Sequence, residues 1–139
     1  MSQSNAGLIR SMYDAFARGD IPYVLGLLDP QAAWHEAENF VYADRSPYIG
    51  PQAILEGVFM RLGAEWENFG AAVEEILSDG DTVIVLGRYH GACRATGVAV
   101  DAQFVHVYRL QNGRIVHFRQ YTDTAQFRDA INAPRSAGA

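Results

Sequence analysis

The sequence predicts an α+β domain, in which helices occupy the first half of the chain and antiparallel strands the second. Apolar residues recur at helical spacing through the first sixty residues. From residue 71 onward they fall in strand-like runs that short turn sequences separate. A chain of 139 residues, 49% of them hydrophobic, can bury one core. We therefore expect a single domain over residues 1–139, with a disordered tail at 133–139.

Three helices are expected before the main sheet. The first covers about residues 4–18, and Gly19 supplies its C-terminal stop. Asp20 then caps a short second helix. Gly50 and Pro51 open the third helix, whose apolar side carries Ile54, Leu55, Val58, Phe59 and Leu62.

One short strand is expected among the helices, at residues 32–37, ahead of a loop at 38–50. The turn sequences SDGD, RATG and QNG then divide the second half into an antiparallel meander, with strands at about 71–78, 82–94, 98–110 and 114–122. A short helix, TAQFRDAI, ends the domain. Asp123 and Gln126 form a capping-box pattern at its start.

Both faces of the predicted sheet carry apolar residues. In the strand at 98–110, Phe104 and Tyr108 point to one face while Val105 and Val107 point to the other. An antiparallel sheet with one face in water alternates more cleanly than this. Helices can cover one face, and we expect a homodimer to cover the outer one.

Composition excludes several classes of function. A net charge of −5 argues against nucleic acid and anionic membranes as partners. All eleven basic residues are arginine, and the missing lysine excludes Schiff-base chemistry, pyridoxal phosphate attachment and a P-loop. The single cysteine, Cys93, is expected to be a small buried residue without a disulfide partner. No apolar run is long enough to span a membrane and no signal-peptide pattern occurs, so we expect a cytoplasmic protein.

Alternation within the later strands selects one set of residues as a candidate pocket wall. The even-numbered positions mix large apolar residues with polar ones near one end of each strand, as small-molecule pockets do. If these sets share a face, the wall contains Arg88, His90, Phe104, His106, Phe118 and Gln120. A single bulge would break this register.

A carboxylate and a tryptophan lie together on the first strand. Trp34 and Glu36 share one side of residues 32–37, and His35 takes the other. A carboxyl group in an apolar cavity has a raised pKa and can act as a base near neutral pH. The alternative is that Glu36 ends the strand at the surface. Arg88 inside a pocket would need an anionic partner, for which Glu36 is one candidate.

The two strand histidines leave several roles open. His90 and His106 could be acid/base groups, hydrogen-bond donors or satisfied structural residues. Metal binding has little support, because the His35-Glu36 pair lacks the HExxH spacing and no other ligand cluster occurs in the sequence. We expect no metal and no cofactor.

The order of elements, with YDAFARGD, WHE and GRIVHFRQYTDTAQF in their places, resembles the nuclear transport factor 2-like superfamily over roughly residues 5–132. The resemblance is strongest to the SnoaL-like and ketosteroid-isomerase-related branch. It implies a conical barrel, open at one end and usually dimeric, in which a curved antiparallel sheet wraps around three N-terminal helices and a short C-terminal helix follows. It leaves the activity open, since the superfamily includes isomerases, cyclases, dehydratases, epoxide hydrolases and non-catalytic binders. The lysine-free composition is typical of a GC-rich bacterial genome and disfavours a nuclear transport role.

Site residues transfer from the relatives only in part. The general-base aspartate of ketosteroid isomerases falls on Glu36, and their protonated aspartate falls on His106, which can donate a hydrogen bond. Their oxyanion-hole tyrosine falls on Met12, although Tyr13 is adjacent. The acid/base aspartate of SnoaL-like cyclases has two candidate positions, at Gln120 or at Asp123.

The epoxide-hydrolase-like relatives activate water with an arginine and two carboxylates. The resemblance places their arginine on Arg88 and their carboxylates on His90 and Gln120. A glutamine cannot act as a general base, so epoxide hydrolysis is disfavoured.

We therefore expect a protein whose pocket binds a small apolar organic molecule. The candidate activities are those of an acid/base isomerase, cyclase or lyase that acts next to a carbonyl group. The catalytic candidates are Glu36, His106 and His90. The substrate-binding candidates are Met12, Phe16, Trp34, Tyr48, Phe59, Arg88, Phe104, Phe118 and Gln120. Whether Tyr13, Tyr42 or Tyr48 reaches the pocket stays open. The alternatives are a non-catalytic binding module, in which polar residues fix ligand orientation, and a cone filled by its own side chains.

Overall fold

The computed structural model describes residues 4–135, so most of the tail predicted at 133–139 lies outside the described residues. Its helices are α1 (Asn5–Ala17), α2 (Ile21–Gly26), α3 (Pro51–Ile54), the π-helical turn η1 (Leu55–Phe59), α4 (Met60–Glu65) and α5 (Thr124–Asn132). Its strands are β1 (Leu28–His35), β2 (Tyr48–Ile49), β3 (Trp66–Asp79), β4 (Thr82–Cys93), β5 (Ala99–Gln111) and β6 (Arg114–Thr122).

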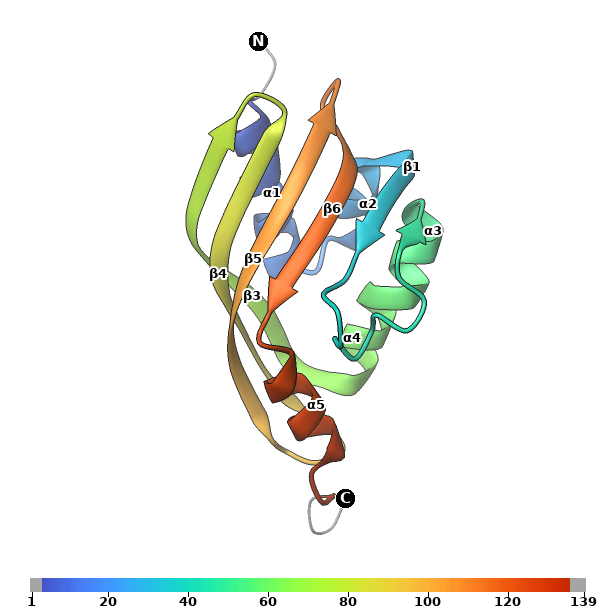
Figure 1. Ribbon diagram of the computed structural model, residues 1–139, viewed down its shortest axis with the longest axis vertical. Coiled ribbons are helices and arrows are strands. Elements are labelled where there is room, and N and C mark those ends of the chain that lie inside the picture. Colours follow the sequence, from blue (N-terminus) through green and yellow to red (C-terminus); the bar gives the residue numbers. More distant parts are fainter. Residues whose placement is uncertain (1–3, 136–139) are drawn as a thin grey trace.

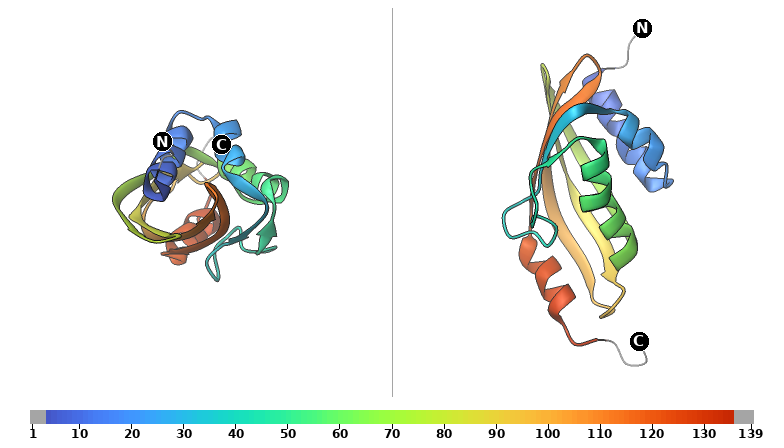
Figure 2. Two further views of the ribbon diagram at one scale, coloured as in Figure 1. Left: turned by 90° about the horizontal axis from the view of Figure 1, so that it is seen from above. Right: turned by 90° about the vertical axis from the view of Figure 1, so that its right-hand side faces the viewer.

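The strands form one curved, open sheet in the order β2-β1-β6-β5-β4-β3. The long strands β3 to β6 make the predicted antiparallel meander. β1 runs parallel to β6, which the sequence did not reveal, because more than half of the chain separates these two strands. Figure 1 shows α5 beyond the end of β6, and Figure 2 shows the other helices on the concave side of the sheet. The predicted cone-like α+β architecture is thus confirmed.

Side-chain caps fix the starts of the first two helices, and of these the sequence predicted Asp20. The Ser4 side chain accepts a hydrogen bond from the Gly7 amide at the start of α1, and the Asp20 side chain accepts one from the Tyr23 amide at the start of α2. Gly19, between the two helices, has φ +73°, a conformation that glycine adopts without strain. These caps fix the turn that brings α2 back toward β1.

The third helix is continuous from α3 through η1 to α4, but its middle is a π-helical turn. Gly57 in this turn lies against the ring of Tyr48. A Cβ atom at Gly57 would fall 2.1 Å from Tyr48 Cε1, so no larger residue fits without movement. The Tyr48 hydroxyl donates to the Tyr42 carbonyl at 2.6 Å, which holds the ring in place. Tyr48 therefore packs the helix against β2.

One expectation about strand faces is wrong. The even residues of β5, and those of β6 from Phe118 onward, do face the helices, but in β4 it is the odd residues that do so. The reason is the register of the β4–β5 hairpin, which places Val85 opposite His106 and Gly87 opposite Phe104. Directly opposite residues share a face of an antiparallel pair. Arg88 and His90 consequently point to the outer face.

The capping box predicted for α5 is only partly present. Asp123 occupies the N-cap position, but its side chain caps no backbone amide. It accepts a hydrogen bond from Gln126 Nε2 at 2.9 Å instead. Gln126 Oε1 accepts from the Asp101 amide at 3.0 Å, so this glutamine docks α5 onto β5. Asp123 is therefore a structural residue at the end of the sheet.

The outer face of the sheet is the side away from the helices. Arg119 and Tyr121, at odd positions of β6, are exposed there. Cys93 is buried and unpaired at the end of β4, as predicted. The homodimer expected on this face stays a prediction. Within residues 4–135, no helix combines the length and apolar character that a membrane crossing requires.

Candidate functional site

A cavity of about 570 Å³ lies between the concave face of the sheet and the helices. Its wall is mainly apolar and comes from α1, α2, the third helix, the loop after β1, and strands β1, β3, β4, β5 and β6. The large apolar residues are Phe16, Ile21, Trp34, Phe40, Val58, Phe59, Leu62, Phe69 and Phe118. Small exposed residues of the wall, namely Ala17, Gly63, Gly70 and Ala72, mark its opening between α1, α4 and β3. The cavity contradicts the alternative in which the protein fills the cone with its own side chains.

Glu36 places a carboxyl group in this wall. The residue directly follows β1, and its amide donates to Ser46 Oγ at 3.0 Å, which ties the strand end to the following loop. Its side chain is 7% exposed and, among the described residues, has no salt-bridge partner. Burial raises the pKa of Glu36 to about 8, because the charged form loses its hydration. The carboxyl group is thus mostly protonated at neutral pH.

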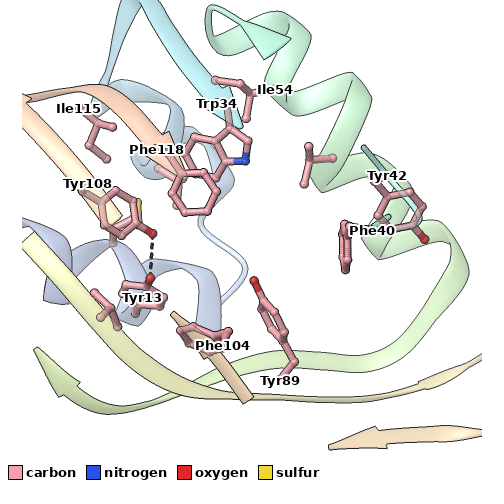
Figure 3. Packing of buried hydrophobic residues seen from close by; sticks show 14 of the residues in the cluster. Tyr13, Trp34, Phe40, Tyr42, Ile54, Tyr89, Phe104, Tyr108, Ile115 and Phe118 are labelled. Carbon is pink, nitrogen blue, oxygen red and sulfur yellow. Dashed lines mark hydrogen bonds between the residues drawn. The ribbon is translucent and has the colours of Figure 1, made fainter. Parts of the chain in front are cut away.

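A chain of buried hydrogen bonds crosses the wall beside Glu36. His106 on β5 has both ring nitrogens within hydrogen-bonding distance of tyrosine hydroxyls, Nδ1 with Tyr13 on α1 and Nε2 with Tyr89 on β4. The Tyr13 hydroxyl shares a further hydrogen bond of 2.7 Å with that of Tyr108. Figure 3 shows this last contact as a dashed line. We call Tyr108, Tyr13, His106, Tyr89 and Gln120 the tyrosine relay.

Gln120 fixes one end of the tyrosine relay. The Ala37 amide donates to Gln120 Oε1 at 3.0 Å, and an amide N–H can only donate. The other side-chain atom of Gln120 must therefore be the NH₂ group, which donates to the Tyr89 hydroxyl at 2.9 Å. Both ends of Gln120 are committed, so it positions Tyr89 and the start of the loop after β1.

The protonation state of His106 follows from its burial. Burial lowers the pKa of His106 to about 3, so the ring is neutral at physiological pH and carries a single N–H. Burial likewise raises the pKa of Tyr13 and of Tyr89 well above the ordinary value, and these phenols remain protonated. The relay is an uncharged hydrogen-bonded chain.

The tautomer of His106 decides which tyrosine offers a free proton. If Nε2 carries the proton, it donates to Tyr89, the Tyr13 hydroxyl donates to Nδ1, and Tyr108 donates to Tyr13. The Tyr89 O–H is then free to bind a ligand. If Nδ1 carries the proton, every donation reverses and the Tyr108 O–H is free instead. Both tyrosines line the cavity, so in either state the free hydroxyl belongs to a residue of the cavity wall.

The structure collects only some of the candidate residues around the cavity. Glu36 and His106 line it, as do Phe16, Trp34, Phe59, Phe118 and Gln120. Met12 is fully buried in the core and Tyr48 packs against Gly57. Phe104 stacks on the ring of His106 at 4.0 Å, behind the wall. These three residues support the site and do not line the cavity.

Arg88 and His90 were expected inside and lie outside. Arg88 Nε donates to Asp101 Oδ1 at 2.7 Å on the outer face, so it is no partner for Glu36. His90 borders the cavity opening, but its half-exposed side chain places Nδ1 3.7 Å from the same carboxylate. The epoxide-hydrolase positions carried over by resemblance therefore do not converge, because two of the three are on the wrong face.

Tyr89 and Tyr108 are the functional candidates that the sequence analysis missed, and Tyr13 was left open. One signal in the sequence identifies Tyr89. The odd residues of β4 contain no charge, whereas the even residues include Arg88 and His90, and the uncharged set belongs inside. Tyr108 lies in the even set of β5, but acid/base chemistry favours His106 as the candidate on that strand.

Comparisons with known proteins agree with this architecture. The SnoaL-like domain family model matches residues 9–118, and the chain belongs to this family, within the nuclear transport factor 2-like superfamily. No curated protein shows significant sequence similarity to the chain.

Several solved structures share the fold. A nuclear transport factor 2-like protein of Burkholderia thailandensis E264 has 33% sequence identity and a TM-score of 0.89, with 94% of this chain and 99% of that chain covered. A similar protein of unknown function from Burkholderia pseudomallei K96243 has 28% identity, a TM-score of 0.84 and coverage of 94% and 100%. TerC, crystallised with polyporic acid, has 23% identity, a TM-score of 0.80 and coverage of 93% and 98%, and this likeness concerns the fold alone.

Proposed function

We propose that the cavity binds an uncharged, largely apolar molecule with a carbonyl group, and that Glu36 transfers a proton at the carbon beside that carbonyl. A free hydroxyl of the tyrosine relay donates to the carbonyl oxygen and stabilises the negative charge that develops there. This chemistry is common to isomerases, cyclases and lyases that form an enol or enolate. Within a family of varied activities, it is the step that these cavity groups support best.

The observation that carries the proposal is the state of Glu36. A carboxyl group with a pKa of about 8 exists in both protonation states near neutral pH, as proton transfer requires. An ion-paired glutamate, which the binding-module alternative assumed, would be held charged. The lack of a salt-bridge partner for Glu36 among residues 4–135 therefore favours acid/base chemistry over that alternative.

The roles of the two histidines change accordingly. Both ring nitrogens of His106 are committed to tyrosines, so it acts through their hydroxyls and does not touch the ligand. His90 points to the outer face and takes no part in the proposed proton transfer. The donor to the carbonyl oxygen is Tyr89 or Tyr108.

Deuterium exchange tests the proposal without knowledge of the natural substrate. Two uncharged aryl ketones, 1-tetralone and 2-acetylnaphthalene, are incubated with the protein in D₂O, and NMR follows exchange of the protons beside the carbonyl. The wild-type protein should accelerate exchange, with a rate that rises with pH through about 8 as Glu36 ionises. Glu36→Gln should lower the enzymatic rate by roughly a hundredfold or more, the contribution of a general base.

Glu38→Gln is the matched control, because Glu38 is an exposed carboxylate two residues away that does not line the cavity. It should exchange both ketones at the wild-type rate. Equal rates for wild type and Glu36→Gln would contradict the proposal. Tight binding of both ketones with no accelerated exchange would leave a binding module as the function.

A further inference from the structure

Trp34 lines the cavity and carries a second polar group, a buried indole N–H. Its side chain is 4% exposed, and its Nε1–H has no hydrogen-bond partner among the residues described. Phe59 packs perpendicular to the indole at 5.6 Å, but a phenyl ring is a weak acceptor compared with an oxygen atom. A buried donor without a partner is costly, and such groups in native proteins call for an explanation.

The indole is rigidly held in this orientation. Its ring stacks on Phe118 with a centroid distance of 3.7 Å and an interplanar angle of 18°. Tyr108 and Phe59 bracket it from other sides. Figure 3 shows the indole nitrogen on the edge of the ring that faces Phe40, and the Tyr89 hydroxyl directed toward the side of Trp34 and Phe118. The two donors come from different strands, β1 and β4, and both residues line the cavity.

The polar groups of the wall also constrain the charge of a ligand. No arginine side chain lines the cavity within residues 4–135, and the chain has no lysine. His106 is neutral, and Glu36 would repel an anion once it ionises. The wall thus offers donors without a compensating cation, an arrangement suited to neutral oxygen acceptors such as ketones, quinones and lactones.

We propose that Trp34 is a specificity-determining residue, and that the ligand carries two separated, uncharged oxygen acceptors on a flat apolar frame, one for the tyrosine relay and one for Trp34 Nε1. The first acceptor rests on the proposed function, in which it is the reacting carbonyl. The second rests on the unpaired indole N–H alone. The flat frame follows from the parallel Trp34–Phe118 stack, which forms a planar aromatic wall.

Matched probes test this inference by calorimetric titration. 2-Acetylnaphthalene and 1-tetralone have one acceptor each. 2,6-Diacetylnaphthalene and 2,3-dimethyl-1,4-naphthoquinone have two, at a wide and a narrow spacing. At least one two-acceptor probe should bind the wild-type protein roughly tenfold more tightly than its one-acceptor counterpart, the value of one hydrogen bond to a buried donor.

Trp34→Phe removes the N–H and keeps an aromatic ring. It should abolish the tenfold ratio between two-acceptor and one-acceptor affinities, because the smaller ring weakens stacking with both kinds of probe alike. Trp66→Phe is the control, because Trp66 Nε1 donates to the Tyr42 hydroxyl at 2.8 Å and Trp66 does not line the cavity. It should preserve the gain. Unfolding midpoints of both variants verify that they fold.

The outcomes separate this inference from the proposed function. A gain that survives in Trp34→Phe, or no gain for either two-acceptor probe, would overturn the role of Trp34 whatever the exchange experiment shows. A gain that Trp34→Phe abolishes, together with unchanged deuterium exchange in Glu36→Gln, would uphold two-point recognition and refute proton transfer. The double variant Tyr89→Phe/Tyr108→Phe, which removes both candidate donors to the first acceptor, should weaken one-acceptor and two-acceptor probes alike.

Discussion

At the scale of single residues, the site depends on how a few protons are distributed among buried groups. His106 is neutral and has one N–H to share between two tyrosines. Gln120 constrains only one end of the relay, since its NH₂ group donates to Tyr89 whichever tautomer is present. The free donor can therefore move between Tyr89 and Tyr108, and a ligand can select either one.

Removal of the Tyr108 hydroxyl should fix the tautomer of His106. In Tyr108→Phe, the Nδ1–H tautomer would leave the buried Tyr13 O–H without an acceptor, whereas the Nε2–H tautomer lets Tyr13 donate to Nδ1. Nitrogen-15 NMR of the imidazole should show Nε2 protonated and Nδ1 unprotonated as the predominant form. Predominance of the Nδ1–H form would contradict the proposed relay. His117, on the outer face, serves as an internal reference whose signals should not change.

The sequence identified several site residues because their environment follows from local pattern. The placement of Trp34 and Glu36 on the inner side of β1 needed only two-residue alternation. The residues that surround Glu36 were not predictable in this way. The raised pKa depends on residues from distant elements that exclude water, and the relay joins Tyr13 to Tyr108 across 95 positions.

At the scale of elements, the positions of the strands were easier to predict than the face of the sheet to which each strand residue points. The four strands of the meander were expected within a few residues of their observed bounds, except that β3 begins at Trp66. The face of β4 was assigned wrongly because register depends on the hairpin between β4 and β5, and a shift of one residue exchanges the two faces. That single error placed Arg88 and His90 in the cavity and left Tyr89 out.

The π-helical turn in the third helix allows a direct test of close packing. Gly57→Ala should destabilise the protein by about 1–3 kcal/mol, because the new Cβ would meet the Tyr48 ring, which its hydrogen bond to Tyr42 restrains. Gly63→Ala, in α4, is the control. Nothing lies within 4 Å of its added Cβ, so the substitution should be neutral or stabilise by up to about 1 kcal/mol. Urea denaturation measures both, and equal stabilities would refute the packing argument.

At the scale of the whole molecule, the outer face of the sheet has an apolar row that none of the helices within residues 4–135 covers. Leu86 of β4 lies opposite Val105 of β5, which lies opposite Tyr121 of β6, and Tyr121 is 53% exposed. We predict that two copies of the chain associate through this row. Light scattering should give the mass of a dimer for the wild type and of a monomer for Val105→Glu. Gln111→Glu, exposed at the end of β5, should remain dimeric, and a wild-type monomer would contradict the prediction.

The stability of the whole molecule should pass through a maximum near pH 6.5, because buried groups titrate in opposite senses. The pKa of Glu36 is about 8 in the folded protein and 4.5 ordinarily. As pH rises between these values, Glu36 ionises in the unfolded chain before it does so in the folded protein, and the free energy of unfolding falls. The pKa of His106 is about 3 in the folded protein and 6.5 ordinarily. As pH falls between these values, His106 takes up a proton in the unfolded chain before it does so in the folded protein, and the free energy of unfolding again falls. The two effects oppose each other between pH 4.5 and 6.5. The lowered pKa values of His35 and His117 add to the loss on the acidic side.

Above pH 6.5 only the Glu36 effect remains, and it should cost about 1.4 kcal/mol for each pH unit up to about 8. The wild-type free energy of unfolding should therefore fall by about 2 kcal/mol between pH 6.5 and 8. Glu36→Gln has a neutral side chain in both states, so its stability should stay nearly constant over this range and exceed that of the wild type at pH 8. Denaturant titrations at both pH values measure the difference. Parallel pH profiles for the two proteins would show that Glu36 ionises normally in the fold, and the case for it as a proton-transfer group would end there.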